Sequence, residues 1–163
     1  MVPHVEATRT PTIEDLRAIT QDHQRLAQCL DQLHRTCIHL NDHLSCESCS
    51  YEQLGVCRGQ LPSFIHDLVD ILNTHFYREE ALMLCMQQQG KSGGDFRAHH
   101  DAHVRILHGL NKLFKEVQQL DRGSRTEEAY FHFDYIIQGT MAEHDRRFDN
   151  DLMLLLKQSL PNA

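Results

Sequence analysis

The sequence has little of several residue types, and each shortage excludes a class of protein. Tryptophan is absent and aromatic residues make up only 7% of the 163 residues, so the core must be largely aliphatic. No apolar run approaches the roughly 20 residues that a membrane-spanning helix needs, and residues 1–10 lack an apolar segment of signal-peptide type. Sixteen Lys and Arg residues against 23 Asp and Glu argue against nucleic-acid and anionic-membrane partners. We therefore expect a cytoplasmic protein.

Proline is also scarce, and its four copies, together with glycine-rich stretches, mark the ends of long segments. We predict one domain, residues 1–163, with an N-terminal tail at 1–11 and a cysteine-containing loop at 45–60. Four helices are predicted, at about 12–44, 61–89, 94–121 and 125–158. Thr12 and Ser124 are the expected N-caps of the first and last helices. Because apolar residues recur every three or four positions, the fold class is all-α, an up-down-up-down antiparallel four-helix bundle.

Histidine is the residue in excess, with 13 copies. Polar residues interrupt the apolar series of all four helices at His23, His75, Glu79, His99, His103 and His144. A buried ionisable group without a partner costs several kcal/mol, so six of them on inward faces need a shared partner. Counting residues from the connections places most of the six at one axial level. Imidazoles with a carboxylate suit iron, zinc or copper, and six groups exceed a structural zinc site, which favours a two-metal centre.

A single inward histidine is more often a hydrogen-bonded core residue than a metal ligand. We assign five further histidines to the core or the surface: His34, His39, His66, His108 and His132.

The segments around the six polar positions resemble the hemerythrin family, in particular its bacterial single-domain or sensor-domain members. The matching segments are QDHQRL at 21–26, HFYREEALM at 75–83, HHDAH at 99–103 and HDRRFD at 144–149. The resemblance covers all four predicted helices. Two residues that directly follow matching histidines depart from the family pattern. Asp145 stands where an apolar residue is common, and His100 offers a competing ligand beside His99.

The resemblance implies a non-haem di-iron centre, bridged by an oxo or hydroxo group, that binds O2 reversibly. By this analogy His99, His103 and His144 would hold one iron. His23 and His75 would hold the other, with an open position for O2, and Glu79 and Asp149 would bridge both.

Asp149 enters this set through the resemblance alone. At about 100° per residue it lies roughly 140° around an α-helix from His144, away from the inward face. Its spacing from His144 alone predicts a solvent-exposed acidic residue. A π-type turn would bring position i+5 onto the same face, and nothing in the sequence indicates one.

The predicted loop at 45–60 carries Cys46, Cys49 and Cys57, and Cys46 and Cys49 have the spacing of a metal-binding or redox pair. His43, His39 or Cys37 could supply a fourth ligand, so this loop is a candidate second site for zinc or for a thiol switch. The alternative is that these are reduced surface thiols of a cytosolic protein. Cys29, Cys37 and Cys85 fall on predicted helices and fit small core positions.

Three functions fit the sequence. The first is reversible binding of O2 or another diatomic ligand, as a sensor domain linked to an output signalling domain or as a carrier, with a homodimer as another possible assembly. The second is a di-iron oxidase, peroxidase or nitric-oxide-handling enzyme. No glutamate has a histidine three residues on, although ferritin-like di-iron enzymes use such pairs, so we expect no enzyme. The third is iron or zinc binding without gas chemistry.

Overall fold

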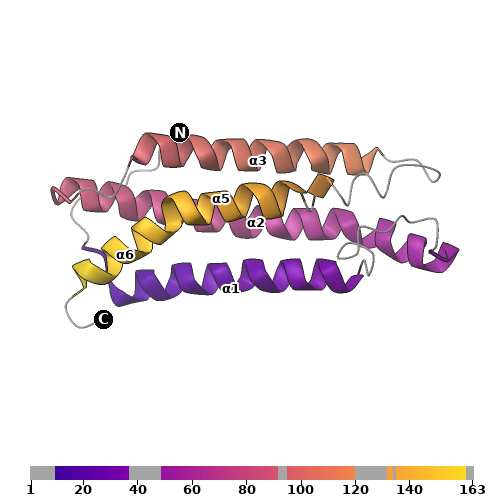
Figure 1. Ribbon diagram of the computed structural model, residues 1–163, viewed down its shortest axis with the longest axis horizontal. Coiled ribbons are helices and arrows are strands. Elements are labelled where there is room, and N and C mark those ends of the chain that lie inside the picture. Colours follow the sequence, from indigo (N-terminus) through magenta and orange to yellow (C-terminus); the bar gives the residue numbers. More distant parts are fainter. Residues whose placement is uncertain (1–9, 37–48, 92–94, 120–131, 134, 161–163) are drawn as a thin grey trace.

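The computed structural model describes residues 10–36, 49–91, 95–119, 132–133 and 135–160. Its elements are α1 (Ile13–Thr36), α2 (Tyr51–Gln88), α3 (Phe96–Gln118), η2 (Ile136–Met141), α5 (Ala142–His144), η3 (Asp145–Asp149) and α6 (Asn150–Ser159). The last four follow one another as a single helical segment, which extends with α1, α2 and α3 along the long axis of the molecule and slants toward α1 at α6 (Figure 1). No strand occurs in these ranges, which confirms the all-α prediction. None of the described helices is both long and apolar enough to cross a membrane.

Side-chain caps begin α1 and α3 close to the predicted positions. At α1 the hydroxyl of Thr12 accepts a hydrogen bond from the backbone of Asp15 at 3.3 Å, and the Asp15 carboxylate accepts one from the Thr12 backbone at 2.8 Å. At α3 the carboxylate of Asp95 accepts from the backbone of Ala98 at 3.1 Å. These bonds satisfy N–H groups that the first helical turn leaves unpaired. The predicted end of the first helix at 44 and the predicted cap at Ser124 lie outside the described residues.

The prediction of a loop through residue 60 is wrong, because α2 already begins at Tyr51. Ser50 and Gln53 form a capping box, with bonds of 3.2 Å to the Ser50 hydroxyl and 2.7 Å to the Gln53 side chain. Two glycines and Pro62 suggested a break, and proline inside a helix costs about 3 kcal/mol. The helix nevertheless continues through Pro62, since Leu61 and Ile65 on either side of it are fully buried.

The core consists of two apolar clusters with a polar layer between them. The larger cluster includes Leu26 of α1 and Phe76 of α2, and the smaller one includes Ile19 of α1 and Leu82 of α2. His23 lies between the two α1 residues along the chain, just as Glu79 lies between the two α2 residues. Each long helix therefore carries its inward polar residues at the level where apolar packing is interrupted.

Candidate metal centre

Seven side chains form the polar layer, and we refer to them together as the centre. They are His23 on α1, His75 and Glu79 on α2, His99 and His103 on α3, His144 on α5 and Asp149 at the end of η3. Six of the seven residues are at most 2% exposed, whereas the His23 side chain retains 33% exposure. The structure thus brings together all seven residues that the hemerythrin resemblance marks as ligands.

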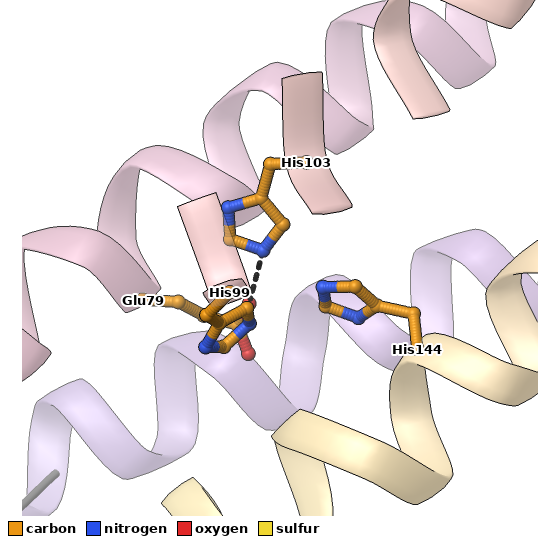
Figure 2. Close-up of side chains that lie close together, drawn as sticks. All are labelled: Glu79, His99, His103 and His144. Carbon is orange, nitrogen blue, oxygen red and sulfur yellow. Dashed lines mark ion pairs between the residues drawn. The ribbon is translucent and has the colours of Figure 1, made fainter. Parts of the chain in front are cut away.

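On α2 and α3 the geometry follows from regular helix. His75 and Glu79 are four residues apart, as are His99 and His103, so each pair projects from one face. The Nε2 atoms of His99 and His103 lie 3.5 and 3.3 Å from the same Glu79 oxygen, Oε2. Figure 2 shows these two rings and that of His144 converging on the Glu79 carboxylate.

On the fourth helical segment a π turn decides the geometry. The segment η3 has π-helical hydrogen bonding, which turns position i+5 back onto the face of position i. His144 Nδ1 therefore lies 3.0 Å from Asp149 Oδ1, and Asp149 is buried. The interpretation of Asp149 as a solvated acid, which its spacing alone suggests, is wrong because it assumes a regular α-helix.

Each carboxylate of the centre divides its two oxygens between two groups of histidines. Glu79 Oε1 faces His75 Nε2 at 3.5 Å, whereas Glu79 Oε2 faces the α3 histidines. Asp149 Oδ2 lies 3.6 Å from His23 Nε2 and 3.7 Å from His75 Nε2. Asp149 Oδ1 lies instead near His99, at 3.5 Å, and near His144. Both carboxylates are thus placed to bridge two cations.

The two candidate cation positions are named here by their histidines. At the three-histidine position, ligand atoms of His99, His103, His144 and Glu79 all lie within 4.8 Å of one another. At the two-histidine position, ligand atoms of His23, His75, Glu79 and Asp149 do the same.

The nitrogen and oxygen atoms that face the two positions lack hydrogen-bond partners. Eleven buried side-chain nitrogen and oxygen atoms of the described residues have no hydrogen-bond partner, and every one belongs to the centre. Leaving a buried polar atom unsatisfied costs about 1–3 kcal/mol, and such atoms are rare in native proteins unless an ion or water completes them. Imidazole nitrogens and carboxylate oxygens are also ligands that iron and zinc accept. The residues present therefore fit a pair of metal cations.

Electrostatics lead to the same conclusion. Burial would raise the pKa of the Asp149 and Glu79 carboxyls, but the surrounding histidines hold both pKa values below the usual range. In return, the Asp149 carboxylate raises the pKa of His23. Burial opposes protonation of His99, yet the two carboxylates raise its pKa to about 9. The carboxylates thus favour a positive charge at His23 and His99, a role that metal cations would also fill.

Glu80, which the sequence analysis did not single out, orients one ligand from outside the centre. Its Oε1 lies 2.7 Å from His103 Nδ1 and 2.9 Å from His100 Nδ1. Because a carboxylate can only accept, Nδ1 of His103 carries the proton and Nε2 is left for a metal. His100 is correspondingly not a ligand of the centre, as it lies on Glu80 with its ring stacked on Phe96.

Two phenylalanines pack directly on ligand rings. Phe76 stacks on His103 with centroids 3.8 Å apart and planes within 10°, and Phe148 stacks on His99 at 4.8 Å with the same angle. These contacts restrict rotation of the two imidazoles and cover the three-histidine position with apolar surface.

A second contact missed by the sequence analysis ties α1 to α2 beside the centre. The carboxylate of Asp22, only 1% exposed, accepts a hydrogen bond from Arg78 Nη1. Asp22 precedes His23 and Arg78 precedes Glu79 in the chain, so this bond holds two ligand-bearing turns together. Its sequence signal is weak because Asp and Arg are ordinary surface residues.

Asp145 lies at the solvent-facing edge of the centre. It is exposed, and one of its oxygens lies within 4.8 Å of ligand atoms of His144 and Asp149. Although the residue is exposed as a whole, partial desolvation of its carboxyl and the nearby Asp149 charge raise the pKa of Asp145 to about 6.

The structure does not test the candidate cysteine site as a whole, because Cys46 and His43 lie outside the described residues, as do Cys37 and His39. Cys49 precedes the capping box of α2. Cys57 lies within α2, half-buried against the larger apolar cluster, rather than in a loop. Among the other histidines, His66, His108 and His132 are exposed and His34 is half-buried. Cys85 is buried and Cys29 half-buried, as expected for small core positions.

Comparison with known proteins gives one match. The sequence model of the hemerythrin HHE cation-binding domain matches residues 14–155, which include every residue of the centre. Searches of curated proteins and of solved structures find no match. The family match spans most of the chain and coincides with the buried cluster of histidines and carboxylates whose polar atoms lack hydrogen-bond partners. The chain therefore belongs to the hemerythrin HHE cation-binding domain family.

Proposed function

We propose that the centre holds two iron ions and that one of them binds O2 or a similar diatomic ligand reversibly. The observation that carries this proposal is the division of the Glu79 and Asp149 oxygens between two cation positions. This division supplies five protein ligand atoms at the three-histidine position but only four at the two-histidine position. Non-haem iron sites that bind O2 similarly keep coordination positions free of protein ligands.

The surroundings of the two positions support the same difference. The three-histidine position is packed against Phe76 and Phe148. The two-histidine position includes His23, whose side chain is the most exposed of the centre. The most exposed ligand therefore belongs to the position with fewer protein ligands. Iron would supply the electrons that reversible O2 binding requires, while the protein holds the ligands and limits access.

We propose a binding module rather than an enzyme. The centre contains five histidines and two carboxylates, whereas ferritin-like di-iron enzymes use carboxylate-rich sites with Glu-x-x-His pairs. A histidine-rich site stabilises highly oxidised iron less well, which favours reversible binding. The roles that follow are an O2-sensing domain, with an output signalling domain or a second copy as partner, or an O2 carrier in the cytoplasm, built as an up-down-up-down bundle. The packing of α1 on α2 and of α2 on α3 supports that helix order.

An optical spectrum tests the proposal. Anaerobic, iron-reduced protein should gain visible absorption bands in air and lose them when O2 is removed. A protein that retains only zinc and stays colourless would contradict the iron proposal. Rapid, irreversible oxidation with turnover of a substrate would favour the enzyme.

Substitution of one ligand checks the assignment. The variant His75→Ala should lose iron because it removes a ligand that is 0% exposed, while the matched control His132→Ala, at an exposed position, should keep it. Equal iron content in both variants would contradict the ligand assignment.

A further inference from the structure

The ligand rings of the three-histidine position are held in place from outside the centre. Glu80 Oε1 lies 2.7 Å from Nδ1 of His103, and Phe76 stacks on the same ring. Phe148 stacks on the ring of His99. The three histidines of this position are at most 2% exposed. Because these rings are already fixed, they lose little conformational freedom when they bind a cation, so the position is preorganised.

The two-histidine position has less of this support. His75 Nε2 faces both carboxylates, so the ring proton must lie on Nδ1 whenever Nε2 binds a cation. That Nδ1 is buried and has no hydrogen-bond partner among the described residues, whereas metal-binding histidines usually donate this proton to an acceptor. The second histidine, His23, has a side chain that is 33% exposed. Cation binding therefore leaves a buried N–H group unsatisfied and immobilises a partly exposed ring.

We infer that the two positions differ in their affinity for cations, and that the two-histidine position is the weaker one, filled second and emptied first. This inference rests on the proposed di-iron centre. Loss of an outer acceptor lowers metal affinity by about 10–100-fold in other histidine sites, so the two dissociation constants should differ by at least about tenfold. The chain then has a one-ion form that lacks the proposed ligand-binding position. The concentration of free Fe²⁺ thus sets the fraction of the protein that is competent to bind a diatomic ligand.

Anaerobic titration of the metal-free, full-length chain with Fe²⁺ tests this difference. Native mass spectrometry counts the bound ions, and competition with a chromogenic chelator gives a dissociation constant for each. The matched variants are His23→Gln and His103→Gln, which each remove one imidazole and keep a polar side chain of similar length. The unsubstituted chain should bind its first ion at least about tenfold more tightly than its second. His23→Gln should keep the tight step, and His103→Gln should bind its remaining ion at least about tenfold more weakly than His23→Gln does.

Circular dichroism of the metal-free variants shows whether they fold. If His103→Gln does not fold, Glu80→Ala takes its place, since the Glu80 side chain is partly exposed and supports the three-histidine position alone. Glu80→Ala should narrow the difference between the two steps, and an unchanged difference would overturn the inference.

Equal affinities of His23→Gln and His103→Gln for their remaining ion would also overturn the inference, because repulsion between two neighbouring cations would then be enough to separate the steps. Loss of both ions from His23→Gln would overturn it as well, since the tight position would then depend on His23. A chain that binds no second ion would overturn the proposed function together with this inference. Stepwise binding of two ions by a chain that does not react with O2 would overturn the proposed function alone.

Discussion

Replacing Glu80 tests how strongly a residue outside the centre controls it. Glu80 contacts no cation position, but its Oε1 lies 2.7 Å from Nδ1 of His103, a buried ligand of the three-histidine position. Without that acceptor, the His103 ring can rotate or change tautomer, and its Nε2 is then less available to a metal. Loss of such an outer carboxylate lowers metal affinity by about 10–100-fold in other histidine sites, or roughly 1.4–2.7 kcal/mol.

The prediction separates three variants. Glu80→Ala removes the acceptor and should show the full loss of metal affinity, about 10–100-fold. Glu80→Gln keeps an oxygen that can accept from Nδ1, so it should recover part of the affinity. His100→Ala removes only the other partner of Glu80, at 2.9 Å and on an exposed ring, and should leave the affinity nearly unchanged. Competition with a chromogenic chelator measures the affinities.

The thermal midpoint of the metal-free protein serves as the control, because a merely structural role would lower it. We expect similar midpoints in all three variants, as the Glu80 side chain is partly exposed and its bonds are local. If Glu80→Ala binds metal as tightly as His100→Ala, the positioning role of Glu80 is refuted.

Three further predictions concern stability. The pKa of His99 is raised from 6.5 to about 9, so protonated His99 stabilises the metal-free fold. This contribution to the free energy of unfolding is complete below pH 6.5 and is lost as the pH rises through 9. Urea unfolding should show this decline without iron, and an identical decline with iron would contradict it. Asp22→Ala should cost about 1–3 kcal/mol of unfolding free energy, because it removes a hydrogen bond between a buried carboxylate of α1 and a charged side chain of α2. The control Asp31→Ala removes an exposed ion pair and should cost less than about 1 kcal/mol, and equal losses would refute the difference. Ser50→Ala should cost about 1 kcal/mol and reduce helical circular dichroism, and an unchanged spectrum would argue against the early start of α2.

The helices and most of the centre are readable from the sequence because they depend on local periodicity. His75 with Glu79, and His99 with His103, share a helix face wherever their segments are helical. Each pair also interrupts an apolar series, which marks it as buried and in need of a partner. Counting residues from the connections then places the pairs at one level. The structure shows that level as a polar layer between two apolar clusters.

The start of α2 is less readable because opposing local signals meet there. Two glycines and Pro62 favour a break, while the capping box at Ser50 and the burial of Leu61 and Ile65 favour helix. Whether helix or break is favoured depends on how Leu61 and Ile65 pack against residues distant in the chain. A local sequence pattern does not contain that information.

By itself, the sequence determined that this is an all-helical protein with histidines and a glutamate on its inward faces, since helical period and polarity are properties of neighbouring residues. Only the tertiary structure decided that Asp149 joins them. In a regular α-helix Asp149 would point away from His144, whereas the π turn brings both side chains onto the same face. The tertiary structure also decided which oxygen faces which histidine, and that Glu80 and Asp22 support the ligands. These contacts join separate helices, so they exist only after the helices have packed.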